Sequence, residues 1–186
     1  VGPTASGKTA YAVKLAKERN GEVVSCDSMQ IYKYMDIGTA KPTPEEMQGV
    51  VHHMLDFVDP RENYSVASFV KDARSCIDDI LSRNKLPVLC GGTGLYIDSI
   101  INQIEFGCEE PDEGYRNELA EFSAKYGNNA LHDKLKEKDP AAAEKIHPNN
   151  VKRVIRALEI IKNTGMTKTA ADGIAKKEQL YDAEII

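Results

Sequence analysis

The sequence has few cysteines, no long apolar run and no leader-like N-terminus. Cys26, Cys76, Cys90 and Cys108 are widely spaced, and none of them forms a Cys-x-x-Cys pair, so neither a zinc site nor a disulfide framework is expected. We interpret them as small buried apolar residues in a reducing cytoplasm. Because no apolar run reaches the roughly 18 residues that span a bilayer, no membrane association is expected.

An excess of positive charge is also missing. Lys and Arg total 24 against 29 Asp and Glu, a formal net charge of −5, which argues against nonspecific binding of nucleic acid. Any contact with nucleic acid must therefore use a local basic patch. The 186 residues, 41% of them hydrophobic and 28% charged, suffice for one ordinary globular core with a small insert.

The first residues match a phosphate-binding loop: a glycine, four residues, then Gly-Lys-Ser/Thr. The pattern consists of Gly2, Pro3, Thr4, Ala5, Ser6, Gly7, Lys8 and Thr9. Backbone N–H groups of such a loop surround a diphosphate, Lys8 would contact its outer oxygens, and Thr9 would place a hydroxyl on Mg²⁺. A helix is predicted from Thr9 to Asn20; the alternative is a mere Gly/Ser-rich turn before that helix. The strand that should precede the loop is expected to be mostly missing from the sequence.

A short β-branched segment, Glu22–Cys26, predicts the next strand, and Asp27 follows it directly. In open α/β sheets ligands bind at the carboxyl ends of strands, so Asp27 is expected in the site. It could hold Mg²⁺ through water or accept a proton from a substrate. The alternative is a structural Asp that caps a helix.

A loop is predicted over Gly38–Gly49, followed by a strand over Met54–Val58. His52 and His53 precede that strand and should point to opposite faces, so they are expected to be structural or hydrogen-bonding residues and not joint metal ligands.

A capped amphipathic helix is predicted over Ser65–Asn84 and a buried strand over Leu86–Cys90. The glycine-rich turn that follows, Gly91–Gly94, allows a close backbone approach, and Thr93 could offer its hydroxyl to a phosphate. The alternative is simply a tight connection.

Charged, helix-favouring segments begin after Pro111 and predict a small helical insert. A further helix, Val151–Asn163, carries Arg153 and Arg156 three residues apart on one face, which could bind a phosphate backbone or be a solvated basic face. We expect an α/β core at 1–106, a helical insert at 107–149 and a return to the core at 150–186, where residues 181–186 would form an edge strand. The predicted class is α/β, a P-loop NTPase-like parallel sheet with crossover helices and a small helical insertion.

Seven sequence blocks together resemble the tRNA dimethylallyltransferase (tRNA isopentenyltransferase) family, from Gly2 to Thr164. They are GPTASGKT, DSMQIY, GTAKPT, HHMLDFVDP, YSVA, GGTGLY and IHPNNVKRVIRALE. The resemblance implies transfer of a dimethylallyl group from dimethylallyl diphosphate to N6 of the adenosine beside the anticodon of tRNA (position 37), with Mg²⁺ and release of diphosphate. The family continues past this tail with helices that complete the RNA-binding channel.

The resemblance also implies roles for single residues. Asp27 would be the general base, Lys8 and Thr93 would assist catalysis, and Thr9 would contact the metal. The residues expected to contact tRNA are Asp27, Ser28, Met29, Gln30, Thr93, Arg116, Lys152, Arg153, Val154, Ile155 and Arg156. A cytoplasmic monomer is expected.

Other functions remain open on the sequence. A P-loop nucleotide or small-molecule kinase could use Asp27 to organise Mg²⁺ with ATP bound at the loop. An adenylate isopentenyltransferase would modify a free nucleotide, and a noncatalytic nucleotide-dependent binding module would need the loop but not the acid beside it.

Overall fold

The structure of the protein is a computed structural model that describes residues 6–102, 112–170 and 180–186. The described residues divide into two compact units, one made of 6–102 with 180–186 and the other of 112–170. Four of the phosphate-loop residues, Gly2, Pro3, Thr4 and Ala5, lie outside the described residues, as does Cys108.

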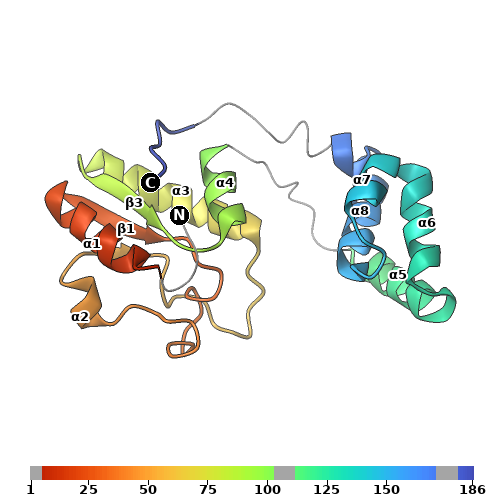
Figure 1. Ribbon diagram of the computed structural model, residues 1–186, viewed down its shortest axis with the longest axis horizontal. Helices are drawn as coiled ribbons and strands as arrows, with labels where there is room; N and C mark the ends of the chain where they lie inside the picture. Colours follow the sequence, from red (N-terminus) through yellow and green to blue (C-terminus); the bar gives the residue numbers. More distant parts are fainter. Residues whose placement is uncertain (1–5, 103–111, 171–179) are drawn as a thin grey trace. The chain divides into compact units, whose positions relative to one another are not determined.

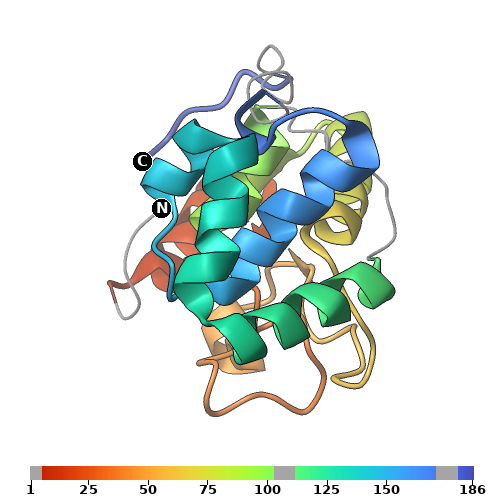
Figure 2. The same cartoon turned by 90° about the vertical axis from the view of Figure 1, so that its right-hand side faces the viewer.

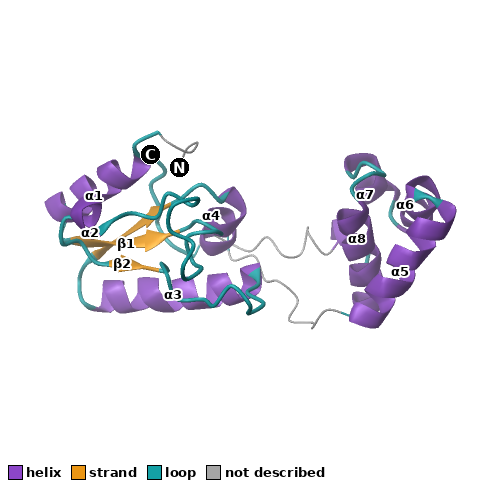
Figure 3. Cartoon of the chain, turned by 90° about the horizontal axis from the view of Figure 1, so that it is seen from below, coloured by secondary structure: helices purple, strands orange, loops and turns teal. Residues whose placement is uncertain are grey.

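A parallel three-stranded sheet forms the centre of the first unit. Strands β1 (Gly21–Ser25), β2 (His52–His53) and β3 (Leu86–Cys90) lie in the order β2-β1-β3, so β1 is central. Figure 1 shows β1 beside β3, and Figure 3 shows β1 beside β2. The expected α/β class with a parallel sheet is confirmed. All three strands end at the same edge of the sheet, where the residues after β1 and β3 are brought together.

Helices cover both faces of this sheet, and alternate residues of β1 show why. Val23 packs with Ala12 and Ala16 of α1 (Lys8–Glu18), whereas Val24 faces Phe69 and the other core residues of α3 (Val66–Ser82). Figure 3 shows α1 and α3 on opposite sides of the strands. The period of two along β1 therefore divides the apolar side chains between two layers.

The remaining helices of this unit are short. Ser65 caps α3 by accepting a hydrogen bond from the Ser68 N–H, as expected. The predicted loop at 38–49 contains a single helical turn, α2 (Pro44–Met47), which Thr43 and Glu46 cap reciprocally. The glycine-rich turn after β3 leads into α4 (Gly94–Ile101), whose Ile97 and Ile100 complete the core beside α3.

Two strand predictions are wrong. The strand expected at Met54–Val58 is not formed, because Met54 and Asp56 have left-handed backbone angles, φ 60° and 55°, which interrupt an extended chain. Only Val58 makes an isolated bridge, to Tyr32, and the neighbouring strand β2 has two residues. Residues 180–186, all of which are described, pair with none of the described strands, so the expected edge strand is absent there.

The described part of the second unit contains the helices α5 (Glu113–Tyr126), α6 (Asn128–Lys138), α7 (Pro140–Lys145) and α8 (Val151–Thr164) (Figure 2). Its core contains Leu119, Leu131, Leu135, Val154 and Leu158.

Helix α8 supplies two of these core residues and packs against α5 and α6. The structure therefore groups α8 with the helical unit, whereas the sequence had suggested a return to the core at residue 150. Among the described helices, none has both the length and the apolar character to cross a membrane.

Candidate active site

Asp27 lies at the carboxyl end of the central strand, and its two carboxylate oxygens have different environments. Oδ1 accepts hydrogen bonds from the N–H groups of Met29 (2.9 Å) and Gln30 (3.3 Å). Oδ2 lies on the side of Gly92, where an added Cβ would stand 3.9 Å from it. Asp27 thus caps a turn with one oxygen, and not a helix as in the structural alternative considered from the sequence, while the other oxygen lies beside the β3–α4 turn.

The β3–α4 turn is joined to the residues after β1 by short contacts. Thr93 Oγ1 accepts a hydrogen bond from the Ser28 N–H (3.0 Å), and the Thr93 N–H donates to the carbonyl of Cys26 (3.2 Å). Gly91 lies so close that an added Cβ would be 2.2 Å from the Cys26 carbonyl oxygen, a contact that only glycine permits. Thr93 and Asp27, predicted from separate motifs, are therefore held side by side.

Lys8 and Thr9 occupy the first turn of α1, after Gly7, whose φ of 77° requires the freedom of glycine. Lys8 Nζ lies 3.5 Å from Ser6 Oγ. Burial raises the pKa of the Cys90 thiol, while Lys8 lowers it and Asp27 raises it, so both charges act on the same thiol. The start of α1 and Asp27 thus belong to one electrostatic environment.

A cavity of about 580 Å³ adjoins Asp27 and is lined by residues of the loop that follows the turn. The lining residues are Asp27, Met29, Tyr34, Met35, Asp36, Ile37, Gly38, Thr39 and Ala40. Ile37 is 99% exposed and Tyr34 83% exposed. The predicted loop over Gly38–Gly49 covers only the second part of this lining, and none of Tyr34, Met35, Asp36 and Ile37 was singled out from the sequence.

Gln30 and Lys41 hold that loop in place. The Gln30 amide Nε2 donates to the carbonyls of Thr39 (3.1 Å) and Ala40 (3.0 Å), and Lys41 Nζ contacts the carboxylates of Asp36 and Asp56. The amide nitrogen of Gln30, a residue predicted to contact RNA, therefore binds the loop. Met29 lines the cavity, and the Ser28 backbone binds Thr93.

A cluster of charged side chains surrounds Glu22 of β1, and it was not predicted from the sequence. Glu22, a β1 residue only 3% exposed, accepts hydrogen bonds from Arg83 and from Lys85 (2.7 Å) and contacts His53 Nε2 (2.7 Å). The hydrogen bond from Arg83 outweighs burial and holds the pKa of Glu22 well below its usual range. His52 Nδ1 contacts the Val50 carbonyl at 2.9 Å, so both histidines are hydrogen-bonding residues as predicted. No group of three His, Cys, Asp or Glu residues suited to a metal occurs in the parts of the chain that the structure describes.

In the helical unit, Arg116 and Arg156 converge on one buried carboxylate. Glu159 is fully buried and accepts from Arg116 Nε and Nη2 (2.9 Å each), from Arg156 Nη1 (2.5 Å) and from the Asp112 N–H (2.9 Å). Burial opposes ionisation of Glu159, but these hydrogen bonds prevail and lower its pKa. Lys162 Nζ in turn lies 2.7 Å from an Asp112 carboxylate oxygen.

The other predicted RNA contacts on α8 divide by exposure. Lys152 and Arg153 are exposed, whereas Val154 and Ile155 are buried in the helical core. This burial argues against contact with RNA through the side chains of Val154 and Ile155. One face of α8 packs in the helical core, and another face carries the exposed cations Lys152 and Arg153.

Comparison with known proteins identifies the family of the chain. The family model described as IPP transferase matches residues 30–186, most of the chain. The chain belongs to the IPP transferase family. A curated relative in this family, tRNA dimethylallyltransferase of Halalkalibacterium halodurans, is 59% identical over 169 residues, which are 91% of this chain and 54% of the relative. The chain thus spans about half the length of the curated relatives it matches.

Solved structures of the IPP transferase family are also similar. The full-length tRNA isopentenylpyrophosphate transferase from Bacillus halodurans is 58% identical, with a TM-score of 0.58 over 88% of this chain and 54% of that one. A eukaryotic dimethylallyltransferase, described as acting on tRNA, is 32% identical, with a TM-score of 0.79 over 95% of this chain and 44% of that one. The family resemblance seen in the sequence blocks is confirmed.

Proposed function

We propose that the protein containing this chain transfers a dimethylallyl group from dimethylallyl diphosphate to N6 of the adenosine adjacent to the anticodon of tRNA. The single observation that carries the proposal is the placement of Asp27 beside Thr93, where β1 and β3 end, in a chain of the IPP transferase family. The similarity to relatives that are described as tRNA dimethylallyltransferases supports the same reaction.

The proposed chemistry is an alkyl transfer. N6 of the adenine attacks the allylic carbon of the diphosphate ester, the carbon–oxygen bond breaks, and diphosphate leaves with the bonding electrons. Asp27 takes the proton that N6 loses. Because Oδ1 is already engaged by the N–H groups of Met29 and Gln30, Oδ2 is the oxygen assigned to the proton.

Charge that develops on the leaving diphosphate must be stabilised. Lys8 and Thr9, at the first turn of α1, are assigned to this group together with the N-terminal N–H groups of the helix. Bound Mg²⁺ would neutralise the diphosphate as it leaves. The hydroxyl of Thr9, together with water and diphosphate oxygens, would supply the hard oxygen donors that Mg²⁺ prefers.

The target base must leave its stack to reach Asp27. Extrusion of a base costs a few kcal/mol, which contacts elsewhere on the RNA must offset. The exposed cations of α8, Lys152 and Arg153, are assigned to the phosphate backbone, which positions the RNA without reading its sequence.

The test follows a radioactive dimethylallyl group from its diphosphate into unmodified tRNA, with Mg²⁺ and the full-length protein. Asp27→Asn is the informative variant, because an amide can still accept the capping hydrogen bonds but cannot take a proton. We expect transfer to fall by about 10²- to 10⁴-fold in this variant. Asp98→Asn, at an exposed site on α4, is the matched control and should transfer at the normal rate.

Other outcomes would identify the alternatives. Label in free adenine nucleotide and not in tRNA would indicate an adenylate isopentenyltransferase. Consumption of ATP with a small acceptor, without transfer of the label, would indicate a kinase and overturn the proposal.

A further inference from the structure

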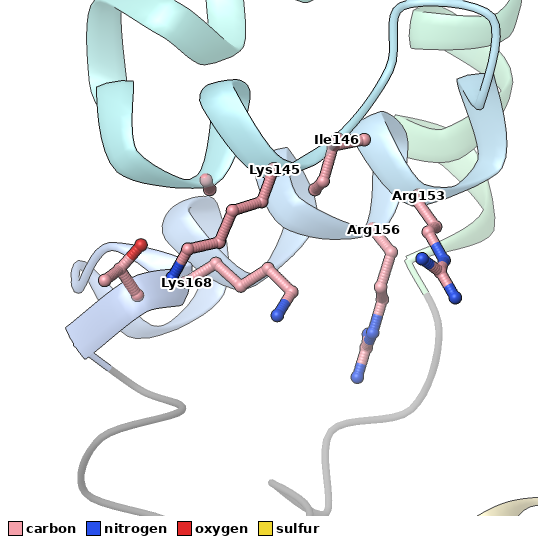
Figure 4. Close-up of a pocket in the computed structure, with 7 residues that line it drawn as sticks. Lys145, Ile146, Arg153, Arg156 and Lys168 are labelled. Carbon is pink, nitrogen blue, oxygen red and sulfur yellow. The ribbon is translucent and has the colours of Figure 1, made fainter. Parts of the chain in front are cut away.

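A second cavity, of about 420 Å³, lies within the helical unit and is bordered by four cationic side chains. Its lining residues are Ala142, Lys145, Ile146, Arg153, Arg156, Lys168 and Thr169. Figure 4 shows Lys145, Arg153, Arg156 and Lys168 extending toward the same side of the helices. The chain has a net charge of −5, but the rim of this cavity carries four positive side chains.

The four cations come from three segments. Lys145 ends α7, Arg153 and Arg156 lie on the first turns of α8, and Lys168 belongs to the segment after α8. The sequence drew attention only to the two arginines, since the lysines lie outside the α8 periodicity. The fold brings Lys145 and Lys168 to the same cavity.

A buried carboxylate fixes the segment that carries Lys168. Asp139, 2% exposed, accepts hydrogen bonds from the N–H (2.9 Å) and the hydroxyl (2.9 Å) of Thr169. It also caps α7 through the Ala142 N–H (3.0 Å). Thr169 is thereby attached to the start of α7, and Lys168, its neighbour in the chain, is held at the cavity.

Two buried carboxylates bond to residues that line this cavity. Asp139 is buried and occupied by Thr169 and Ala142, and Glu159 is fully buried beneath Arg116 and Arg156. Burial raises the pKa of Asp139, but the hydrogen bonds from Thr169 and Ala142 and the charge of Lys168 together lower it. A ligand in the cavity would meet cations at its rim and the apolar side chains of Ala142 and Ile146.

We propose that Lys145 and Lys168, with Arg153 and Arg156, form a binding site for a backbone phosphate of the RNA substrate. This inference rests on the proposed function and adds two lysines to its RNA-binding surface. A phosphate group fits because it carries charge that several cations can share, and because arginine can bind it through two parallel N–H groups. Asp139 is a positioning residue, which acts on the RNA only through Thr169 and Lys168.

The test measures binding of unmodified tRNA to the full-length protein at several salt concentrations. Lys145→Ala and Lys168→Ala should each weaken binding about three- to ten-fold at low salt and lower the slope of log affinity against log salt by about one. The matched control is Lys136→Ala, an exposed lysine of α6 that does not line the cavity. The KM for dimethylallyl diphosphate should be unchanged in all three variants.

Thr169→Val tests the positioning role without removing a charge. The loss of its hydroxyl should weaken tRNA binding in the same direction as Lys168→Ala, and Thr169→Ser should restore it. A merely structural role would lower stability in Thr169→Val but leave the salt slope unchanged.

Titration of inorganic phosphate into the wild type and Lys168→Ala distinguishes a site for the phosphate of an RNA backbone from a site for a small free anion. Lysine-dependent binding of phosphate together with unaltered tRNA affinity in both lysine variants would overturn the proposal in favour of a small-anion site. Unaltered tRNA binding in an enzyme that still transfers the label would overturn this inference alone. Absence of transfer by the wild type would instead contradict the proposed function.

Discussion

The hydroxyl oxygen of Thr93 accepts a hydrogen bond from the backbone N–H of Ser28 across 3.0 Å, and so joins the end of β3 to the end of β1. The two residues are 65 positions apart in the chain. Their contact fixes the turn that carries Asp27 relative to the β3–α4 turn. Thr93 therefore has a structural function besides the catalytic one proposed for it.

Replacement of Thr93 by Val should isolate the effect of its hydrogen bond from that of its packing. Valine keeps the shape of the side chain but lacks the oxygen that accepts the hydrogen bond from Ser28. We expect a loss of about 1 kcal/mol in the free energy of unfolding, since the half-buried Ser28 N–H loses its partner. Thr93→Ser keeps the oxygen and should retain most of the stability. Urea denaturation checks both values, and equal stability of the Val variant and the wild type would contradict the role assigned to this hydrogen bond.

Gly91 and Gly92 form a matched pair for the close approach of the two turns. Gly91→Ala should destabilise the protein by about 2–3 kcal/mol, because the new Cβ would overlap the Cys26 carbonyl. Gly92→Ala, whose nearest contact is an ordinary 3.9 Å to Asp27, should change stability by less than about 1 kcal/mol. Thermal unfolding of both variants measures the difference, and similar melting temperatures would show that the turns are not held this closely.

The cluster around Glu22 predicts a pH dependence of stability. Its pKa is lower in the folded protein than its ordinary value of 4.5, so its contribution to stability is complete above about pH 4.5 and declines as the pH falls below that value. In Glu22→Gln the free energy of unfolding should be smaller at pH 7, and its difference from the wild type should shrink toward acid pH. Urea titrations at a series of pH values test this, and a constant difference between pH 7 and pH 3 would contradict it.

Glu159→Gln removes the charge that Arg116 and Arg156 share inside the helical unit. We expect a loss of about 1–3 kcal/mol, less than for a wholly buried pair, because both arginines are partly exposed and can be rehydrated. Glu113→Gln is the control, since Glu113 is an exposed neighbour 3.5 Å from Arg116 and should have little effect. Denaturant unfolding followed by circular dichroism compares the two, and an equal effect would contradict the importance of burial.

The sequence predicted the helices and the two five-residue strands well because each carries a strong local signal. The helical period of α3, its Ser65 cap and the β-branched run of β1 are properties of neighbouring residues. The predicted strand at 54–58 failed because Met54 and Asp56 turn into the left-handed region, which periodicity does not reveal.

The candidate site was partly predictable for a similar reason. Asp27 and Thr93 follow strands, and parallel strands end at one edge, so their proximity follows from topology. The partners of Arg116 and the cavity that gathers Lys145 and Lys168 depend on packing between helices distant in sequence. Side-chain contacts between distant helices cannot be predicted from the pattern of a single amino-acid sequence.

The bonds around Asp112 have a consequence for how this protein can vary. The Asp112 N–H donates a hydrogen bond to Glu159 and its carboxylate accepts one from Lys162, so the described part of the helical unit begins beside α8. Contacts inside the helical unit therefore offset part of the conformational entropy that is lost when this segment is ordered. Chimeras that exchange this unit between members of the family should therefore fold.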